Sequence, residues 1–189
     1  MKLIQLGLSF MNEDGKTPEE ADAYQFNFRF NLSKEFQVAS SIALLRQHGI
    51  DFQRFCTEGI SPIYFSYQFA QSGLLTNKKL RWIFFHGSYD MGYLVKQVTL
   101  ADLPPSSSEF VELFQKYFPN VVDLKVSLDW SSSLAKLMEE SGVPRRGESH
   151  QAGSDALGTV EVYLARRERD RQRFDENVGI IYDINQKKK

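Results

Sequence analysis

Two short segments of the sequence combine a histidine with an aspartate where a helix is expected to begin. They are HGSYD, residues His86–Asp90, and HQAGSD, residues His150–Asp155. In α/β proteins ligands collect beyond the carboxyl ends of strands, so Asp90 and Asp155 could converge in one crevice. Carboxylates that share a site stay ionised together only with a cation between them, and such hard oxygen ligands select Mg²⁺ or Mn²⁺. His150 could then take a proton from a water activated by the metal.

Each of these residues also has a structural explanation. An aspartate at a helix start often caps the helix or interacts with its dipole, and a loop histidine is often structural. His86 is expected to make a structural hydrogen bond, Asp123 to be structural, and Cys56 to be a small filler or a surface thiol. The sequence contains none of the Gly-rich phosphate loops, paired-cysteine zinc patterns or serine nucleophile elbows that mark other sites. The residue pattern by itself leaves a metal hydrolase as one hypothesis.

The elements that must position these residues alternate between strands and helices. Period-two or continuous apolar runs predict strands at five places, which are Lys2–Phe10, Tyr24–Phe30, Leu80–Phe85, Val121–Leu124 and Val178–Ile184. The first two form a hairpin around Asp14-Gly15, with Phe26, Phe28 and Phe30 on one face. The run at Leu80–Phe85 is typical of a fully buried strand.

Caps and periodicity predict helices between these strands. They are expected from Asn31 or Ser33 to His48, over about Pro62–Gln71, after His86–Asp90, from Pro104 through Tyr117, around Leu134–Met138, and over about Ser154–Arg173. In the first of these helices the buried side is expected to hold Ile42, Leu44 and Leu45, and in the third one face is expected to hold Tyr89, Tyr93 and Leu94. In the last helix Leu157, Val160 and Leu164 face inward, and the charged run RRERDRQR is expected to be a solvated surface. The lysine tail is expected to be disordered.

This order of elements predicts a mixed α/β sheet with helices on both sides, in a single domain spanning residues 1–189. About residues 174–189 form the C-terminal strand and basic tail. Hydrophobic residues make up 42% of the chain, which is enough for a packed core. The formal net charge is −1, so any RNA contact must be a local groove rather than a basic face.

The single cysteine suits a reducing compartment and excludes an internal disulfide or a thiolate metal cage. No apolar run reaches the length of a membrane span, and the N-terminus has no signal-peptide pattern. The sequence therefore predicts a soluble, intracellular protein without a membrane partner.

Several segments together resemble the CCR-associated factor deadenylases, the poly(A) ribonuclease subunits of the CCR-NOT complex. The resemblance runs from the N-terminus to about Arg167, and its segments are KLIQLGLSFMNEDG, FNFRFNL, SIALLRQHGIDF, GYLVK after HGSYD, and HQAGSDAL. The last is the most specific of them, and SIALLRQHGIDF is closer to plant-type members.

This resemblance implies the fold of ribonuclease D and removal of adenylate from the 3′ end of messenger RNA. In that family four acids hold two Mg²⁺ or Mn²⁺ ions and a histidine acts on the attacking water. Matched by motif, Asp90 and Asp155 are metal ligands and His150 is the general base. The resemblance also implies poly(A) tails, the Not scaffold and the partner deadenylase as partners, and a location in cytoplasm and nucleus.

One motif of the family has no counterpart in the sequence. The first two acids form a D-x-E on a strand that precedes KLIQLGL, and we expect no room for it before Met1. Without it, occupancy of at least one metal site is expected to collapse and strand edges to be left unpaired. Either the sequence is a fragment or incomplete gene product of a poly(A)-specific ribonuclease, or it is a shortened, catalytically inactive paralogue that serves as a scaffold subunit.

Overall fold

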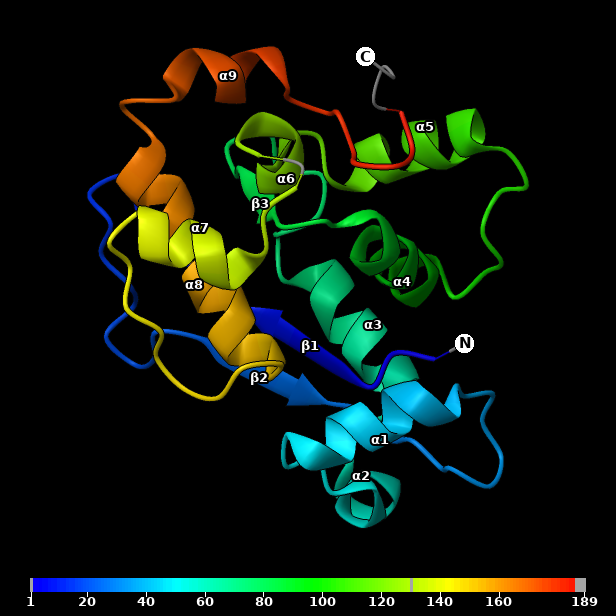
Figure 1. Cartoon of the computed structure of the whole chain (residues 1–189). Helices are drawn as coiled ribbons and strands as arrows, with labels where there is room; N and C mark the ends of the chain where they lie inside the picture. The colour runs from blue at the N-terminus through cyan, green and yellow to red at the C-terminus, as the bar shows by residue number, and fades with distance from the viewer. Residues whose placement is uncertain (1, 130, 186–189) are drawn as a thin grey trace.

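The computed structural model describes residues 2–129 and 131–185 (Figure 1). Its strands are β1 (Gln5–Leu8), β2 (Tyr24–Asn27), β3 (Trp82–Phe84) and β4 (Val121–Asp123). Its helices are α1 (Ala39–Gln47), α2 (Phe52–Glu58), α3 (Pro62–Gln71), α4 (Ser88–Thr99), α5 (Ser107–Tyr117), α6 (Leu124–Ser127), α7 (Leu134–Glu140), α8 (Ala152–Arg166) and α9 (Arg171–Glu176). Within the described residues, none of these helices combines the length and apolarity needed to cross a membrane.

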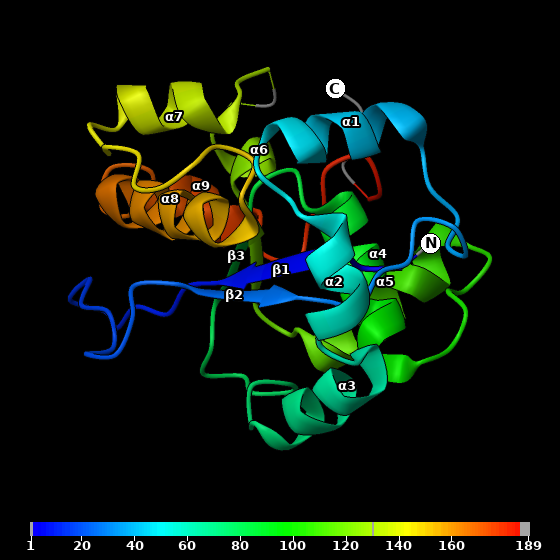
Figure 2. The ribbon, with the colours of Figure 1, turned by 90° about the horizontal axis from the view of Figure 1, so that it is seen from below.

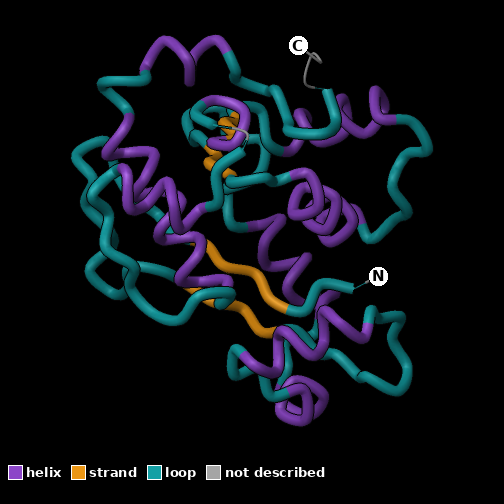
Figure 3. Tube along the Cα trace, viewed as in Figure 1, coloured by secondary structure: helices purple, strands orange, loops and turns teal. Residues whose placement is uncertain are grey.

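The four strands form two separate pairs (Figure 3). β1 and β2 are antiparallel, with Gln5 opposite Asn27 and Leu8 opposite Tyr24. β3 and β4 are parallel, with Trp82 opposite Val121. The mixed α/β class expected from the sequence is confirmed. The strands form two narrow sheets rather than the one mixed sheet that was expected.

Helices cover both faces of the β1–β2 pair (Figure 2). α8 packs against β1, β2 and β3, and therefore bridges the two sheets. Gly7 permits this contact, because a Cβ added there would lie 1.9 Å from the carbonyl oxygen of Ala152 at the start of α8. On the other face Phe65 of α3 makes edge contacts with the rings of Phe26 and Phe28.

The apolar side chains pack into three clusters. The largest joins α3, α4 and α5 to β2 and β4, and its fully buried members include Phe28, Met91 and Phe114. A second joins α7 and α8 to β4 around Val122 and Leu137. The third holds α1 and α2 against Phe30 and neighbouring apolar residues. These clusters fix α4 and α8, the two helices that carry the predicted aspartates.

The first predicted helix begins later than expected. Asn31 accepts a hydrogen bond from the backbone N–H of Ser33, a local turn that competes with helix formation, and α1 starts only at Ala39. Ile42 is buried and Leu45 partly buried as predicted, but Leu44 is exposed. α2 was not anticipated; Asp51 caps it by accepting from the N–H groups of Gln53 and Arg54.

The C-terminal predictions were also partly wrong. The last long helix ends at Arg166 instead of Arg173, and α9 follows after a turn. In this turn Asp170 is buried and forms ion pairs with Arg166, Arg169 and Arg173. Residues 178–185 form turns instead of the predicted strand, although Ile181 is fully buried. The final lysines lie outside the described residues.

Two further expectations about side-chain position need correction. Tyr89 does not share the buried face of α4 with Leu94, because its side chain is 73% exposed. Trp82, Ile83 and Phe84 are only partly buried, so β3 is not the fully buried strand predicted. A cavity on one side of β3 explains this exposure.

Candidate active site

A cavity of about 1440 Å³ separates β1 from β3. Residues 2–13 and 79–85 line it on either side, and α8 contributes a face along its length. Asp90, Asp155 and His150 all line this cavity, together with Arg145. Two segments that are far apart in the sequence, His86–Asp90 and His150–Asp155, therefore bring the predicted residues to the same cavity.

Asp90 lies in the first turn of α4, directly after β3 and the loop His86–Gly87. Desolvation, and after it the negative charge of Asp123, raises the pKa of Asp90 to about 6; Asp155 adds to the rise and His86 opposes it. The side chain keeps solvent access at the cavity wall. Water there screens the neighbouring charges, so Asp90 still ionises at neutral pH.

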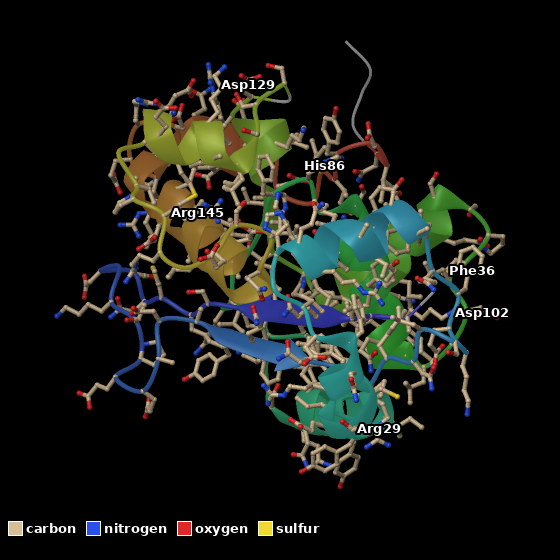
Figure 4. The ribbon with its side chains drawn as sticks, turned by 60° about the horizontal axis from the view of Figure 1, so that its bottom comes forward. Arg29, Phe36, His86, Asp102, Asp129 and Arg145 are labelled. Carbon is tan, nitrogen blue, oxygen red and sulfur yellow. The ribbon has the colours of Figure 1, made fainter. Side chains whose placement is uncertain are left out.

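Asp155 lies in the first turn of α8 and is already paired with a cation. Nη1 of Arg145 donates to its Oδ1 over 2.7 Å and also reaches Oγ of Ser154 at 3.3 Å. Figure 4 shows Arg145 beside α8. No sequence signal pointed to this pair, because the two residues are joined through a loop rather than through one helix. Arg145 supplies the positive charge that the carboxylate needs in this state.

His150 occupies a left-handed backbone position (φ 63°) just before α8. Its ring lies 4.5 Å from that of His48 at the end of α1. The next residue fixes the loop, because the side-chain oxygen of Gln151 accepts from Gln5 and Gln25, and its nitrogen donates to the carbonyl of His48. The HQAGSD segment is thus held to β1, β2 and α1 by its glutamine, a role that sequence reasoning missed.

Asp123 is fully buried behind the cavity wall and serves the backbone. It accepts from the N–H groups of His86, Gly87, Lys125 and Tyr182 over 3.0 to 3.4 Å. Burial raises its pKa despite these bonds. His86 contributes its backbone N–H to this network, while its ring contacts Tyr182 and its Nε2 lies 3.7 Å from Asp183. This geometry supports the structural roles expected for both residues.

The sequence profile of the CAF1 family of ribonucleases matches residues 1–73 and 72–146. The chain belongs to this family. It is 40% identical over 194 residues to the probable CCR4-associated factor 1 homolog 10 of Arabidopsis thaliana, covering 97% of the chain and 70% of that protein. It is 39% identical to the poly(A) ribonuclease pop2 of Schizosaccharomyces pombe, covering 89% and 52%, and 36% identical to the CCR4-NOT transcription complex subunit 7 of Caenorhabditis elegans, covering 87% and 56%. The chain thus spans just over half the length of the latter two.

Solved structures agree with this assignment. The S. pombe Pop2p structure with Mg²⁺ and Mn²⁺ bound superposes with a TM-score of 0.90 at 36% identity, covering 96% of this chain and 74% of that one. The CAF1 chain crystallised with the yeast NOT1 MIF4G domain gives 0.81 at 27% identity, covering 95% and 74%. The ribonuclease fold expected from the resemblance is therefore confirmed.

The residues of this CAF1-family chain fit part of a divalent-metal site. Asp90 and Asp155 are carboxylates that line one cavity, and the charge of Asp155 adds to the raised pKa of Asp90. Mg²⁺ is commonly held by one or two carboxylates with water and substrate phosphate completing its shell. Across residues 2–129 and 131–185, however, no three acidic, histidine or cysteine side chains cluster closely enough to hold a metal. Within the described residues, Asp90 and Asp155 are thus a partial set of donors for a divalent ion.

Replacing Asp90 by asparagine is expected to stabilise the domain at neutral pH. The raised pKa means that the folded state binds this proton more tightly than the unfolded chain, so stability falls as pH rises through about 6. Asp90→Asn removes that loss. After allowance for solvent screening we expect about 1 kcal/mol, or about 2–4 °C in Tm, at pH 7.5. Thermal unfolding followed by circular dichroism should show the gain shrinking below pH 6 and disappearing below about pH 4. The same substitution at exposed Asp14 is the control, and an equal gain there would contradict the explanation.

Proposed function

We propose that this chain is a poly(A)-specific 3′→5′ exoribonuclease domain of the CCR-NOT complex, acting by two-metal hydrolysis once further carboxylates complete its site. The observation that supports this is the arrival of Asp90, Asp155 and His150 at one cavity in a CAF1 ribonuclease fold. The poly(A) ribonuclease name of the S. pombe relative supports the substrate. The metals bound in the Pop2p structure support the cofactor.

In this proposal Asp90 and Asp155 would hold Mg²⁺ or Mn²⁺, which when bound supplies Lewis-acid activation of the attacking water and charge stabilisation at the scissile phosphate. Asp90 must first lose its proton, which its pKa of about 6 allows at neutral pH. Asp155 must release the guanidinium of Arg145. His150 accepts the proton from the attacking water, and the anchoring of Gln151 keeps its loop in place.

Selectivity for adenine is expected to come from stacking and backbone contacts along a single strand, since the net charge of −1 offers no basic face. The test is release of adenosine monophosphate from a short RNA with a 3′ A tail, in Mg²⁺ or Mn²⁺ at pH 7.5. Matched RNAs ending in C or U test specificity. Equal trimming of all three tails would refute poly(A) specificity. If no adenosine monophosphate is released with either metal, even when a segment that carries the further carboxylates is added, the nuclease assignment is refuted.

A non-catalytic scaffold subunit is the second candidate. It is favoured by the lack of any cluster of three or more metal-binding side chains in the part of the chain that the structure describes. The names of the C. elegans relative and of the yeast NOT1 co-crystal support docking on the Not scaffold, and the partner deadenylase is proposed on the same family grounds. Under either function the chain would work in the cytoplasm and the nucleus.

Affinity purification distinguishes the two candidates. The non-catalytic function would be favoured if a tagged chain recovers the Not scaffold and the partner deadenylase but trims no RNA, even when a segment that carries the further carboxylates is added. Metal-dependent trimming by the purified chain would favour the enzyme.

A further inference from the structure

The end of α1 is fixed by backbone hydrogen bonds and by a buried side chain. The N–H of Gly49 donates to the carbonyl of Arg46, and the next N–H, that of Ile50, donates to the carbonyl of Leu45. Gly49 adopts a left-handed conformation (φ 81°), so the helix ends in a Schellman motif. Ile50 is buried in the third apolar cluster. His48, which lies between the last turn of α1 and this glycine, is therefore held from both sides.

His48 contacts two consecutive residues of the HQAGSD segment. Its carbonyl accepts a hydrogen bond from the side-chain nitrogen of Gln151. Its ring lies 4.5 Å from the ring of His150, and the two ring planes meet at 59°. Figures 1 and 2 show the end of α1 beside the start of α8. The first of these contacts anchors the loop, whereas the second acts on the imidazole of His150 itself.

The position of His150 depends on such contacts. Its backbone is left-handed, a conformation that residues other than glycine keep only where their surroundings hold them in it. The residue is exposed at the edge of the cavity, so core packing does not fix its ring. A ring that turns freely spends little time in the one orientation from which it can accept a proton from a given water. The ring of His48 limits that freedom.

We propose that His48 is a positioning residue, whose ring holds the imidazole of His150 in the orientation needed for proton transfer. His150 lines the cavity, whereas His48 is outside the cavity wall, so His48 acts through His150 rather than on a substrate. The consequence for catalysis rests on the proposed function, in which His150 is the general base. The ring contact does not rest on it, and is therefore measured separately.

Nuclear magnetic resonance of the full chain measures the ring contact without RNA or metal. The chain has three histidines, so their ring signals can be told apart at about pH 8.5, above the ordinary histidine pKa of about 6.5. The ring of His48 should shift the signals of His150 away from those of free histidine. His48→Ala should abolish this shift, while His48→Phe, which keeps an aromatic ring, should retain one. The signals of His86, whose ring contacts Tyr182, are the internal control. Identical His150 signals in all three chains would overturn the proposal, whether or not the chain trims RNA.

Initial rates of adenosine monophosphate release measure the consequence for catalysis, with a segment that carries the further carboxylates added. His48→Ala is expected to lower kcat about tenfold with little change in KM, because the substrate contacts remain while the base loses its orientation. His48→Phe should restore most of the rate. Gln47→Ala, at an exposed position beside His48, is the matched control and should leave the rate unchanged. Equal rates for His48→Ala and the unmodified chain would contradict the positioning role.

A double substitution distinguishes positioning from direct action on RNA. In a chain that already carries His150→Ala, adding His48→Ala should cause no further loss, because the residue that His48 positions is gone. A further loss would mean that His48 acts on the RNA directly, and would overturn the proposal. All variants keep the backbone carbonyl that anchors Gln151, and circular dichroism checks that they fold. If the resonance shifts behave as expected but the unmodified chain releases no adenosine monophosphate, the nuclease function is rejected and the positioning contact stands.

Discussion

Replacing Asp123 by alanine is expected to unfold the domain or nearly so. The carboxylate is fully buried and accepts from four backbone N–H groups, which come from the loop after β3, from α6 and from the C-terminal turns. Each buried donor left without a partner costs about 1–3 kcal/mol, so a loss of at least about 4 kcal/mol is expected. A domain of ordinary stability has only about 5–15 kcal/mol in total.

Thermal and urea unfolding measure this effect, and a fall in Tm of at least about 10 °C is expected. Asp123→Asn should lower the stability nearly as much, because the NH₂ group of the asparagine amide is a donor and would face backbone N–H donors. Asp129 is the matched control, since it also accepts several hydrogen bonds, from Ser131 and Ser132, but in a surface turn. A small effect of Asp123→Ala, comparable with that of Asp129→Ala, would show that the network does not hold the loop His86–Gly87 in place.

Replacing Asp155 by asparagine is expected to lower adenosine monophosphate release by at least about a thousandfold, equivalent to about 4 kcal/mol of activation barrier. The side chain keeps its shape but loses the charge that would hold a divalent ion and that now pairs with Arg145. The assay uses an A-tailed RNA with Mn²⁺, and the unmodified chain provides the reference rate.

The control for this loss is Asp102→Asn, because the side chain of Asp102 is 97% exposed and pairs with Lys96 at the surface. Circular dichroism should show that Asp155→Asn keeps its fold, which separates lost chemistry from lost structure. A variant that retains more than a tenth of the reference rate would remove Asp155 from the proposed metal site.

The sequence predicted the strand and helix order around the candidate site well. Helix α3 has the predicted bounds, and the apolar run before HGSYD forms β3, because local capping and periodicity determine both. HQAGSD was specific enough to indicate the family. The two aspartates line one cavity because α8 packs against β3, the strand that precedes Asp90. Their positions after a strand and at the start of a helix already suggested this.

Other features depend on contacts that no local pattern encodes. The Arg145–Asp155 pair and the glutamine contacts between Gln5, Gln25 and Gln151 join distant segments through polar side chains. The late start of α1 reflects a local turn, in which the side chain of Asn31 accepts a hydrogen bond from the backbone N–H of Ser33 instead of capping a helix. Residues 178–185 have the apolar content of a strand, but they pack as turns, with Tyr182 donating its backbone N–H to Asp123.

If Asp155 holds a divalent ion as proposed, metal binding would be an ion exchange, in which the metal replaces the guanidinium of Arg145 on the carboxylate. The carboxylate at the start of α8 would then have a cation beside it both with and without the metal. Chelators should consequently strip the protein of metal without melting it, unlike domains whose folding depends on their ion. Raising the ionic strength should favour the guanidinium over the metal, because screening weakens the attraction of a divalent ion to the carboxylate more than that of a monovalent group.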